Sequence, residues 1–461
     1  MSRHLHRPLT PLAAAIAALV IGHTAAAQQA ALEEITVTAQ KREESLKDVP
    51  ISVNVVDSSR LEAGNINKLA DLTEFVPNLS IAETAVSTQL YIRGIGSGNN
   101  QGFEQSVGQY VDGVYYSRQM LMRAPYLDLS RIEVLRGPQS TLFGKNSIAG
   151  ALNYTTARPT REAEVKVDWL HEFESNQDEV TGVVSGPLSD TLRGRFAFRD
   201  YREDGYIRDT FKNADEPKRD EGTYRLTLDW DATPNLDTSL KVERNNFETH
   251  GRQVEVVRDD PNQFPAGSTP LAGKNAAQIL QLLGQPAMDS TLDFNRQVDA
   301  PEQSHNHIDN QTLTLNYVLG KLKLTSITGH MRYDTHEDCD CDYTPANIFT
   351  VTLGETYGQW SQELRLASPA GGAFEWMTGV YWQRSDMTSL EVLNVPYDSL
   401  IKTLALSSTN PSTRALAAVA GTKVWRDNGQ SGSADAAFFQ GTWKLADDVR
   451  VSVGGRFTHE D

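Results

Sequence analysis

The chain has 461 residues, of which 60 are acidic and 43 are basic, so its formal net charge at pH 7 is −17. This length exceeds what one ordinary hydrophobic core organises, and at least two domains are expected. The negative charge argues against a nucleic-acid-binding protein, which needs a basic surface to displace counterions from phosphate. No interior run approaches the roughly 20 apolar residues of a membrane helix. A soluble β protein and a membrane barrel both stay open, because only alternate residues of a barrel strand face lipid.

The start of the chain has the pattern of a secretory signal peptide. A basic beginning precedes an apolar run over residues 12–21, and the three alanines at 25–27 provide the small side chains of a cleavage site. The apolar run is too short to serve as a membrane anchor. We therefore expect residues 1–27 to be removed and the mature protein to leave the cytoplasm.

The next two regions differ in their content of core-forming residues. Residues 28–48 are polar and are expected to form a flexible segment, in which residues 34–39 are β-prone but have no hydrophobic partner nearby. From residue 49 to 160 the pattern predicts a small mixed α/β domain. Apolar residues alternate over 51–55 as in a strand, and leucines at helical spacing precede Pro77, which ends the helix.

From residue 161 to 461 apolar and polar residues alternate with a period of two. Tyr224, Leu226 and Trp230, for example, interleave with Arg225 and Asp229. We count about eleven such strands. Short turns alternate with long connections, which we place at about 250–305, 334–356 and 388–432. Long strands, aromatic residues near their ends and connections of unequal length favour an outer-membrane barrel over a soluble sandwich.

The two cysteines lie in an acidic stretch, His336-Glu337-Asp338-Cys339-Asp340-Cys341-Asp342. The spacing allows a tight disulfide in an oxidising compartment, or a soft-metal site in which the thiolates and His336 are ligands. We favour a polar loop whose thiols are incidental or paired, and we assign no metal site.

Several motifs occur in a fixed order along the chain. They are Val49-Pro50-Ile51-Ser52-Val53, Tyr91-Ile92-Arg93-Gly94-Ile95, Tyr110-Val111-Asp112-Gly113-Val114-Tyr115, the run from Asp128 to Gly144, and Ser361-Gln362-Glu363-Leu364-Arg365-Leu366. Together they resemble the TonB-dependent outer-membrane receptors, siderophore receptors among them, over the whole chain. The resemblance implies a plug domain over residues 49–160 inside an all-β membrane barrel of 22 antiparallel strands.

Residues 161–461 are long enough for only about half of that barrel. Half a barrel would leave two unpaired sheet edges in lipid, which is very costly. We therefore expect the sequence to be the N-terminal part of a longer receptor.

The resemblance also implies roles for particular residues. The segment Glu34-Ile35-Thr36-Val37-Thr38-Ala39 resembles the TonB box, a free strand that adds to a sheet of the periplasmic protein TonB. Arg93 and Arg136 resemble plug arginines that pair with barrel carboxylates, and Glu363 is the candidate carboxylate. The alternative is that these arginines hold turns of the plug together through backbone carbonyls.

Apical plug loops contact ligand in the family, which makes ligand-binding candidates of Gln89, Tyr91, Asn99, Asn100 and Gln101. Two apolar stretches lie in the long connections: residues 276–283 have helical spacing, and residues 400–406 are largely apolar. They are candidates for a lid or a hydrophobic mouth, or for short helices that pack a loop against the barrel rim.

The implied function is import across the outer membrane of a Gram-negative bacterium, driven through TonB by the proton-motive force and without a cofactor. A ferric siderophore is the favoured ligand, and haem, cobalamin and carbohydrates are alternatives. The alternative class is a passive porin or adhesin barrel, which needs neither a plug nor an N-terminal strand. We do not expect an enzyme, because the sequence contains no HExxH, GxSxG or phosphate-loop motif.

Overall fold

The structure, a computed structural model, describes residues 36–83, 88–98, 104–263, 271–286, 288–408, 410–446 and 448–461. The expected signal peptide, the first two residues of the expected TonB box (Glu34 and Ile35) and the ligand candidates Asn99, Asn100 and Gln101 lie outside these residues. The chain divides into two compact units, Met1–Val49 and Pro50–Asp461, and each is described by itself.

The described part of the first unit is a small hairpin. Strand β1 (Thr36–Val37) pairs antiparallel with β2 (Glu44–Ser45), and a short 3-10 helix, η1 (Leu46–Asp48), follows. A turn closes the hairpin, with the Lys41 amide donating to the Thr38 carbonyl at 2.7 Å. The expectation of a wholly free strand is therefore wrong for Thr36 and Val37, because the chain supplies its own pairing strand. A ladder of two residues is only marginally stable by itself.

The second unit begins with a mixed α/β globule, residues 50–156. One sheet has the order β3-β9-β10-β7-β8 and the other the order β4-β5-β6. The strands β10 and β7 are parallel, whereas the other pairs are antiparallel. The elements are β3 (Val53–Asp57), α2 (Ser58–Ala63), α3 (Leu69–Phe75), β4 (Leu79–Glu83), β5 (Thr88–Ile92), β6 (Ile95–Gly96), β7 (Val107–Val111), β8 (Val114–Tyr116), η2 (Gln119–Arg123), β9 (Leu129–Arg136) and β10 (Gly150–Thr156).

The core of the globule lies between its helices and sheets. Leu69 and Leu72 of α3, Ile132 of β9 and Leu152 of β10 are buried in one cluster. The Asp71 carboxylate accepts from the Lys68 amide at 3.0 Å, which caps the start of α3. This arrangement confirms the mixed α/β prediction.

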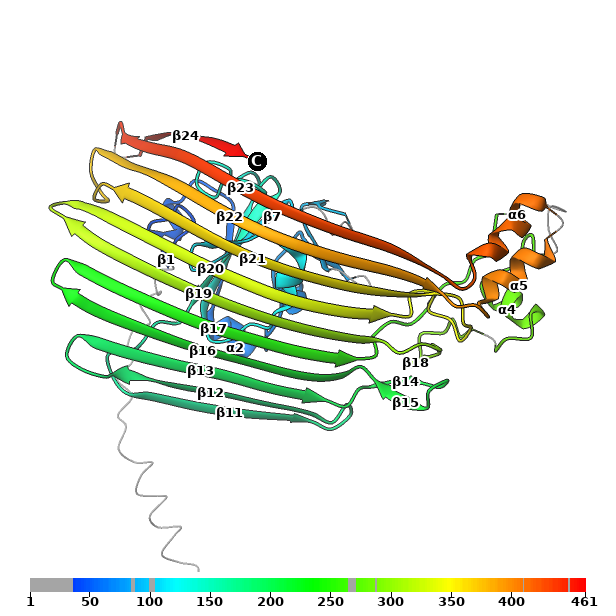
Figure 1. Cartoon of the computed structure of the whole chain (residues 1–461). Coiled ribbons are helices and arrows are strands. Elements are labelled where there is room, and N and C mark those ends of the chain that lie inside the picture. The colour runs from blue at the N-terminus through cyan, green and yellow to red at the C-terminus, as the bar shows by residue number, and fades with distance from the viewer. Residues whose placement is uncertain are drawn as a thin grey trace, which may run out of the picture. The chain divides into compact units, whose positions relative to one another are not determined.

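The rest of the second unit is dominated by one antiparallel sheet of eleven strands, paired in chain order (Figure 1), as the sequence predicted. The strands are β11 (Glu164–Glu172), β12 (Gln177–Pro187), β13 (Leu192–Glu203), β16 (Lys218–Thr233), β17 (Leu236–His250), β19 (Gln303–Leu319), β20 (Leu322–Cys339), β21 (Thr350–Ala367), β22 (Phe374–Val395), β23 (Thr422–Lys444) and β24 (Arg450–Glu460). In the described residues, the outermost strands β11 and β24 are not paired with each other.

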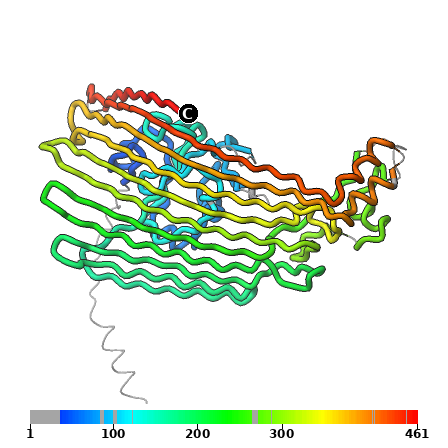
Figure 2. Tube along the Cα trace, viewed as in Figure 1, coloured from blue at the N-terminus to red at the C-terminus, as the bar shows by residue number. Residues whose placement is uncertain are grey.

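The connections are long at one end of the sheet and short at the other (Figure 2). We call the end with the long connections the outer end. It carries β14 (Ile207–Asp209), β15 (Ala214–Glu216), β18 (Asn295–Arg296), α4 (Ala276–Leu282), α5 (Leu400–Ser407), α6 (Pro411–Ala415) and η3 (Leu416–Val419).

The three long connections were predicted with unequal accuracy. The first, residues 251–302, matches the prediction, but the other two are shorter, at 340–349 and 396–421. The polar outer ends of strands β20–β23 continue the ladder, as in the pairing of Asp338 with Thr352. Apolar side chains such as Leu353 and Val392 are buried there, but they are interspersed with polar and glycine residues, which weakens the alternation that marks a strand.

The two faces of the sheet have opposite polarity. On β16, Tyr224, Leu226 and Trp230 are 42–50% exposed, whereas Arg225 and Asp229 are buried against the globule side. A soluble sandwich would bury the apolar face and expose the polar one. The observed polarity is that of a membrane barrel with a polar lumen. Among the described residues, no helix is long and apolar enough to cross a membrane.

Candidate functional site

The globule contacts the polar face of the sheet through ion pairs of both signs. We call this contact the globule–sheet interface. Its first ion pair joins Asp112, in the turn between β7 and β8, to Lys241 of β17. Asp112 is oriented from within the globule, since its Oδ1 accepts from the Thr156 amide and its Oδ2 from the Thr156 hydroxyl, each at 2.9 Å. Burial is the largest single influence and opposes ionisation of Asp112, but the charge and hydrogen bond of Lys241, the Thr156 amide and the Arg225 charge together hold the pKa of the carboxyl below its usual value.

The turn that carries Asp112 has a backbone conformation that its sequence favours. Asp112 and Gly113 both have positive φ angles, 51° and 85°. Aspartate followed by glycine is a favoured pair for such a tight hairpin turn. The motif Tyr110–Tyr115 therefore places a carboxylate at the tip of a hairpin, where it reaches the sheet.

A second ion pair lies at the start of β9. Arg195 of β13 donates from Nε and Nη2 to the two Asp128 oxygens at 2.6 Å each, and from Nη1 to Glu164 at 2.8 Å. The neighbouring Arg225 of β16 donates to the Leu127 carbonyl at 2.7 Å. A bidentate guanidinium–carboxylate pair fixes orientation as well as distance. Asp128 begins the longest family motif, and this contact gives its first residue a physical role.

Other pairs have the opposite polarity, with the cation on the globule. Arg118 contacts Glu355 of β21 at 3.3 Å, and Arg123 of η2 contacts Glu337 of β20. Farther along the chain, Arg158 contacts Asp229 of β16 at 3.0 Å. Ion pairs of both signs oppose sliding, because a shift of the globule would bring like charges together.

An apolar cluster lies beside these ion pairs. Leu121 of η2 packs with Phe247, Met331, Tyr333 and Tyr357 of the sheet. The Ser117 and Tyr357 hydroxyls are 2.8 Å apart, and the Gln359 side chain donates to the Tyr115 carbonyl at 2.9 Å. The interface is therefore mixed: polar contacts predominate, and apolar contacts lie among them, including a second small cluster that joins Leu127 to Val183 and Ala197 of the sheet.

The predicted lock residues lie elsewhere. Arg93 Nη2 donates to the Ser52 hydroxyl at 3.3 Å, and Arg136 Nη2 donates to the Asn54 side chain at 2.6 Å, so both arginines hold turns of the globule. Glu363 pairs with Arg365 on its own strand at 3.0 Å. The expected pair between Arg136 and Glu363 is therefore absent from the described residues. Both arginines act within the globule, as the alternative predicts, but they donate to side-chain oxygens and not to backbone carbonyls. Arg136 lies close to Ser52 and Asn54 because β9 and β3 are neighbours.

A cavity of about 230 Å³ opens where the globule, the sheet and the first long connection meet. Its lining includes four cationic side chains and one carboxylate, namely Lys68, Arg123, Arg219, Arg252 and Glu221. Thr88 also lines it. The ligand candidate beside Thr88, Gln89, is itself buried and accepts a hydrogen bond from Tyr91 at 2.7 Å. No simple sequence motif could have assembled this set, because its members come from distant parts of the chain.

The two apolar stretches in the long connections form the predicted helices α4 and α5. Leu280 of α4 and Leu400 of α5 pack with Ala346 of the connection between β20 and β21. Three connections thus share one small core. This contact fits helices that pack loops together better than it fits a separate lid.

The cysteines are bonded to each other, Cys339 to Cys341. Their sulfurs are therefore not free thiolates for a soft metal, and His336 instead contacts Asp338 at 3.2 Å. The interpretation as a polar loop with paired thiols fits.

Replacing Arg195 with alanine is expected to loosen the globule–sheet interface. The Arg195 side chain is 6% exposed, and its loss leaves Asp128 and Glu164 without their shared cation. Removing one partner of a buried pair costs about 3–5 kcal/mol. We expect amide hydrogen exchange near Asp128 to become at least about tenfold faster. The control is Arg202→Ala on the same strand, whose side chain is 68% exposed; equal acceleration in both variants would contradict the assignment.

Comparison with known proteins identifies the globule. The family model of the TonB-dependent receptor plug domain matches residues 45–151. The iron-regulated outer membrane virulence protein of Vibrio cholerae is 30% identical over 173 residues, which cover 35% of this chain and 26% of that protein. The vitamin B12 transporter of Vibrio vulnificus is 24% identical over 262 residues, covering 54% of this chain and 42% of that transporter.

Solved structures extend the likeness to the sheet. The ferric yersiniabactin uptake receptor of Yersinia pestis has a TM-score of 0.67 at 18% identity and covers 89% of this chain. The pyoverdine receptor of Pseudomonas aeruginosa has a TM-score of 0.71 at 15% identity, and the match covers 92% of this chain. The chain spans 56% and 54% of these two proteins. Residues 45–151 are thus a plug domain of the TonB-dependent receptor family, and the eleven antiparallel strands that follow, with a polar inner and an apolar outer face, have the fold of these outer-membrane receptors.

Proposed function

We propose that the protein to which this chain belongs imports a ferric siderophore across the outer membrane, driven through TonB. The observation that carries the proposal is the globule–sheet interface, in which ion pairs of both signs join the plug to the barrel wall. When a polar contact separates, its groups bind water in place of their protein partners, so the free-energy cost is small. Separation of a dry apolar core costs more, because it exposes apolar surface to water. Such a plug can close the barrel and still move when it is pulled.

The same organisation supports an orientation in the membrane. Outer-membrane barrels have short periplasmic turns and long external loops. The outer end of the sheet then faces the outside, and the cationic cavity lies on the side from which ligand arrives. The first unit, which carries residues 36–39 of the proposed TonB box, is the part that TonB would grasp by strand addition.

The charges of the cavity favour an anionic ligand. Arg123, Arg219 and Arg252 line it with Lys68, against one lining carboxylate, Glu221. The three arginines also pair with carboxylates behind the lining, Arg123 and Arg252 with Glu337 and Arg219 with Glu203. Many ferric chelates are anionic, and a concave site lined by cations attracts them. The volume of about 230 Å³ is below the usual range for a whole drug-sized ligand, so we assign it to one part of the ligand. The iron-regulated relative and the yersiniabactin and pyoverdine receptors support the same class.

Uptake by the full-length receptor tests the proposal. Cells that depend on this receptor should accumulate radioactive iron from an anionic ferric siderophore, and a protonophore should stop accumulation without removing surface binding. Labelled cobalamin is the comparison ligand, because one relative is a vitamin B12 transporter. Accumulation of cobalamin in place of iron would contradict the ligand class. Accumulation that survives the protonophore would contradict coupling and would favour a passive barrel.

A further inference from the structure

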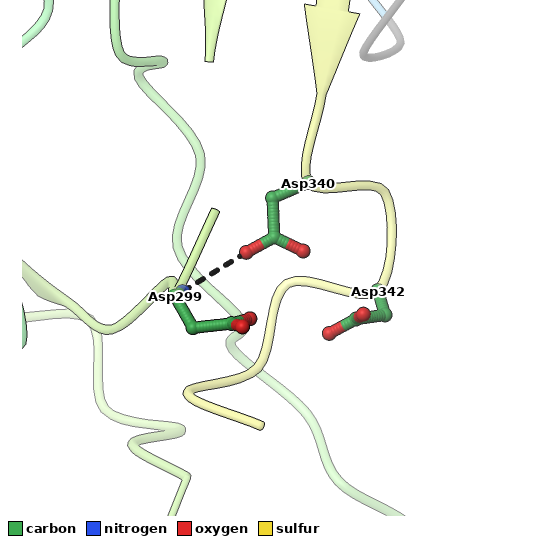
Figure 3. A group of neighbouring side chains, drawn as sticks. All are labelled: Asp299, Asp340 and Asp342. Atoms are coloured by element: carbon green, nitrogen blue, oxygen red, sulfur yellow. Dashed lines mark hydrogen bonds between the residues drawn. The ribbon is translucent and has the colours of Figure 1, made fainter. Parts of the chain in front are cut away.

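Three aspartates converge at the outer end of the sheet, away from the globule–sheet interface. Asp299 comes from the connection before β19, and Asp340 and Asp342 come from the connection after β20. One carboxylate oxygen of each lies within 4.8 Å of those of the others, and Figure 3 shows the three side chains pointing toward one another. The two connections are far apart in the sequence and meet at these carboxylates.

One oxygen in this cluster lacks a hydrogen-bond donor. Asp340 is fully buried, and its Oδ2 accepts from the Asp299 amide at 3.1 Å and the Ala300 amide at 3.2 Å. Its Oδ1 is also buried but accepts no hydrogen bond within the described residues, and the Asp340 carboxylate as a whole faces the other two (Figure 3). A buried carboxylate oxygen without a donor is costly, because it has lost its water and gained no replacement.

The nearby cations are bound to other carboxylates. Arg296 contacts Glu302 at 2.7 Å, Arg252 contacts Glu337 at 2.9 Å, and Lys212 contacts both Glu216, at 2.9 Å, and Asp209, at 3.2 Å. In the described part of the chain, no lysine or arginine forms an ion pair with Asp299, Asp340 or Asp342. Three carboxylates therefore share a partly buried site without a neutralising side chain.

We propose that Asp299, Asp340 and Asp342 bind a calcium ion. Carboxylate oxygens are the ligands that hard divalent cations prefer. A spread of up to 4.8 Å between oxygens suits calcium, whose oxygen ligands lie at about 2.3–2.6 Å, better than magnesium, which requires about 2.0–2.1 Å and strict octahedral geometry. Asp340 lies between the two cysteines of the disulfide Cys339–Cys341. Because both sulfurs are in this bond, they are not thiolate ligands for a metal. Water would complete the coordination shell.

Calcium at this site would tie two outer connections together. Asp342 also orients its own loop, because its Oδ1 accepts from the Thr344 amide at 3.0 Å and its Oδ2 from the Phe349 amide at 3.2 Å. The same connection contributes Ala346 to the core that it shares with α4 and α5. Loss of the ion should therefore loosen all three long connections.

Calcium binding to the detergent-solubilised protein tests this proposal. We expect saturable binding by calorimetry, a rise in Tm on adding calcium and its reversal by a chelator, with magnesium at least about tenfold weaker. Asp340→Asn keeps the shape of the side chain but removes a charge, and it should weaken calcium binding at least about tenfold. Without calcium this variant should be as stable as the unchanged protein or more so, because repulsion within the cluster is relieved.

Two further variants keep the test decisive. Asp342→Asn should weaken binding as Asp340→Asn does, which covers the case in which one variant fails to fold. Asp289→Asn is the control, since it removes a carboxylate from the connection that holds Asp299; among the described residues, Asp289 accepts a hydrogen bond only from the Thr291 amide, at 2.9 Å. Absence of calcium binding, tighter binding of magnesium, or equal loss in the Asp289 variant would overturn the proposal. It is independent of which ligand the receptor imports.

Discussion

Thr36→Pro is expected to reduce energised uptake to the level of a strain without TonB, while ligand binding at the cell surface stays unchanged. Proline removes the backbone N–H of residue 36 and cannot donate to a neighbouring strand. If TonB grasps residues 34–39 by adding them to its own sheet, this lost bond lies in the middle of the contact. The measurement compares iron accumulation with surface binding in one strain.

The hairpin of the first unit requires a particular control. Thr36 pairs with Ser45, so Thr36→Pro also disrupts the ladder between β1 and β2. Ser45→Pro disrupts the same ladder from the other side but leaves residues 34–39 unchanged, and it should preserve uptake. Thr36→Val, which retains the amide and the β-branched side chain, should preserve uptake as well. If Ser45→Pro abolishes uptake as completely as Thr36→Pro, the hairpin is essential and the proposed TonB box is not supported.

The strands were predictable because their signal is local. Each strand of the sheet places alternate residues on opposite faces, so Tyr224 and Arg225 reveal the strand and its two environments without knowledge of any other strand. The same reasoning found α4 from its helical spacing, and it marked the stretch that forms α5 as apolar. It failed at the outer ends of β20–β23, where apolar residues such as Leu353 and Val392 are interspersed with polar and glycine residues and the alternation is weak.

The contacts of the interface were not predictable in this way. The pair of Asp128 and Arg195 joins residues 67 positions apart, and Asp112 and Lys241 are 129 positions apart. Each depends on the register of the sheet and on the orientation of the plug, neither of which has a local signature. The resemblance to the family drew attention to Arg136. In the structure, other charged residues of the same motifs, Asp112 and Asp128, contact the sheet instead. The calcium cluster was missed for a similar reason, since Asp299 is remote in sequence from Asp340.

A disulfide between plug and barrel is expected to stop uptake without affecting ligand binding. Gly329 of β20 faces β8, and a Cβ at this glycine would lie 2.7 and 2.8 Å from the two methyl carbons of Val114. The sulfur of a cysteine at 114 would occupy one of those methyl positions, close enough for a bond to a cysteine at 329. The Ser361 hydroxyl oxygen, also 2.8 Å from that Cβ, must rotate away. The oxidised Val114→Cys, Gly329→Cys protein should bind siderophore normally and accumulate none.

Reduction should restore uptake, and this reversal separates a locked plug from a misfolded one. The native pair Cys339–Cys341 is also open to reduction, so the unchanged protein must be treated with the same reductant. Gly329→Cys with Val114→Ala carries the same crowding at β20 but lacks the second sulfur, and its uptake should not respond to oxidation. Full uptake by the oxidised double cysteine would show that β8 stays against the wall during transport. Only a part of the plug that is closer in sequence to the N-terminus would then move, and the ion pairs at Asp112 and Asp128 would be permanent attachments instead of contacts that open.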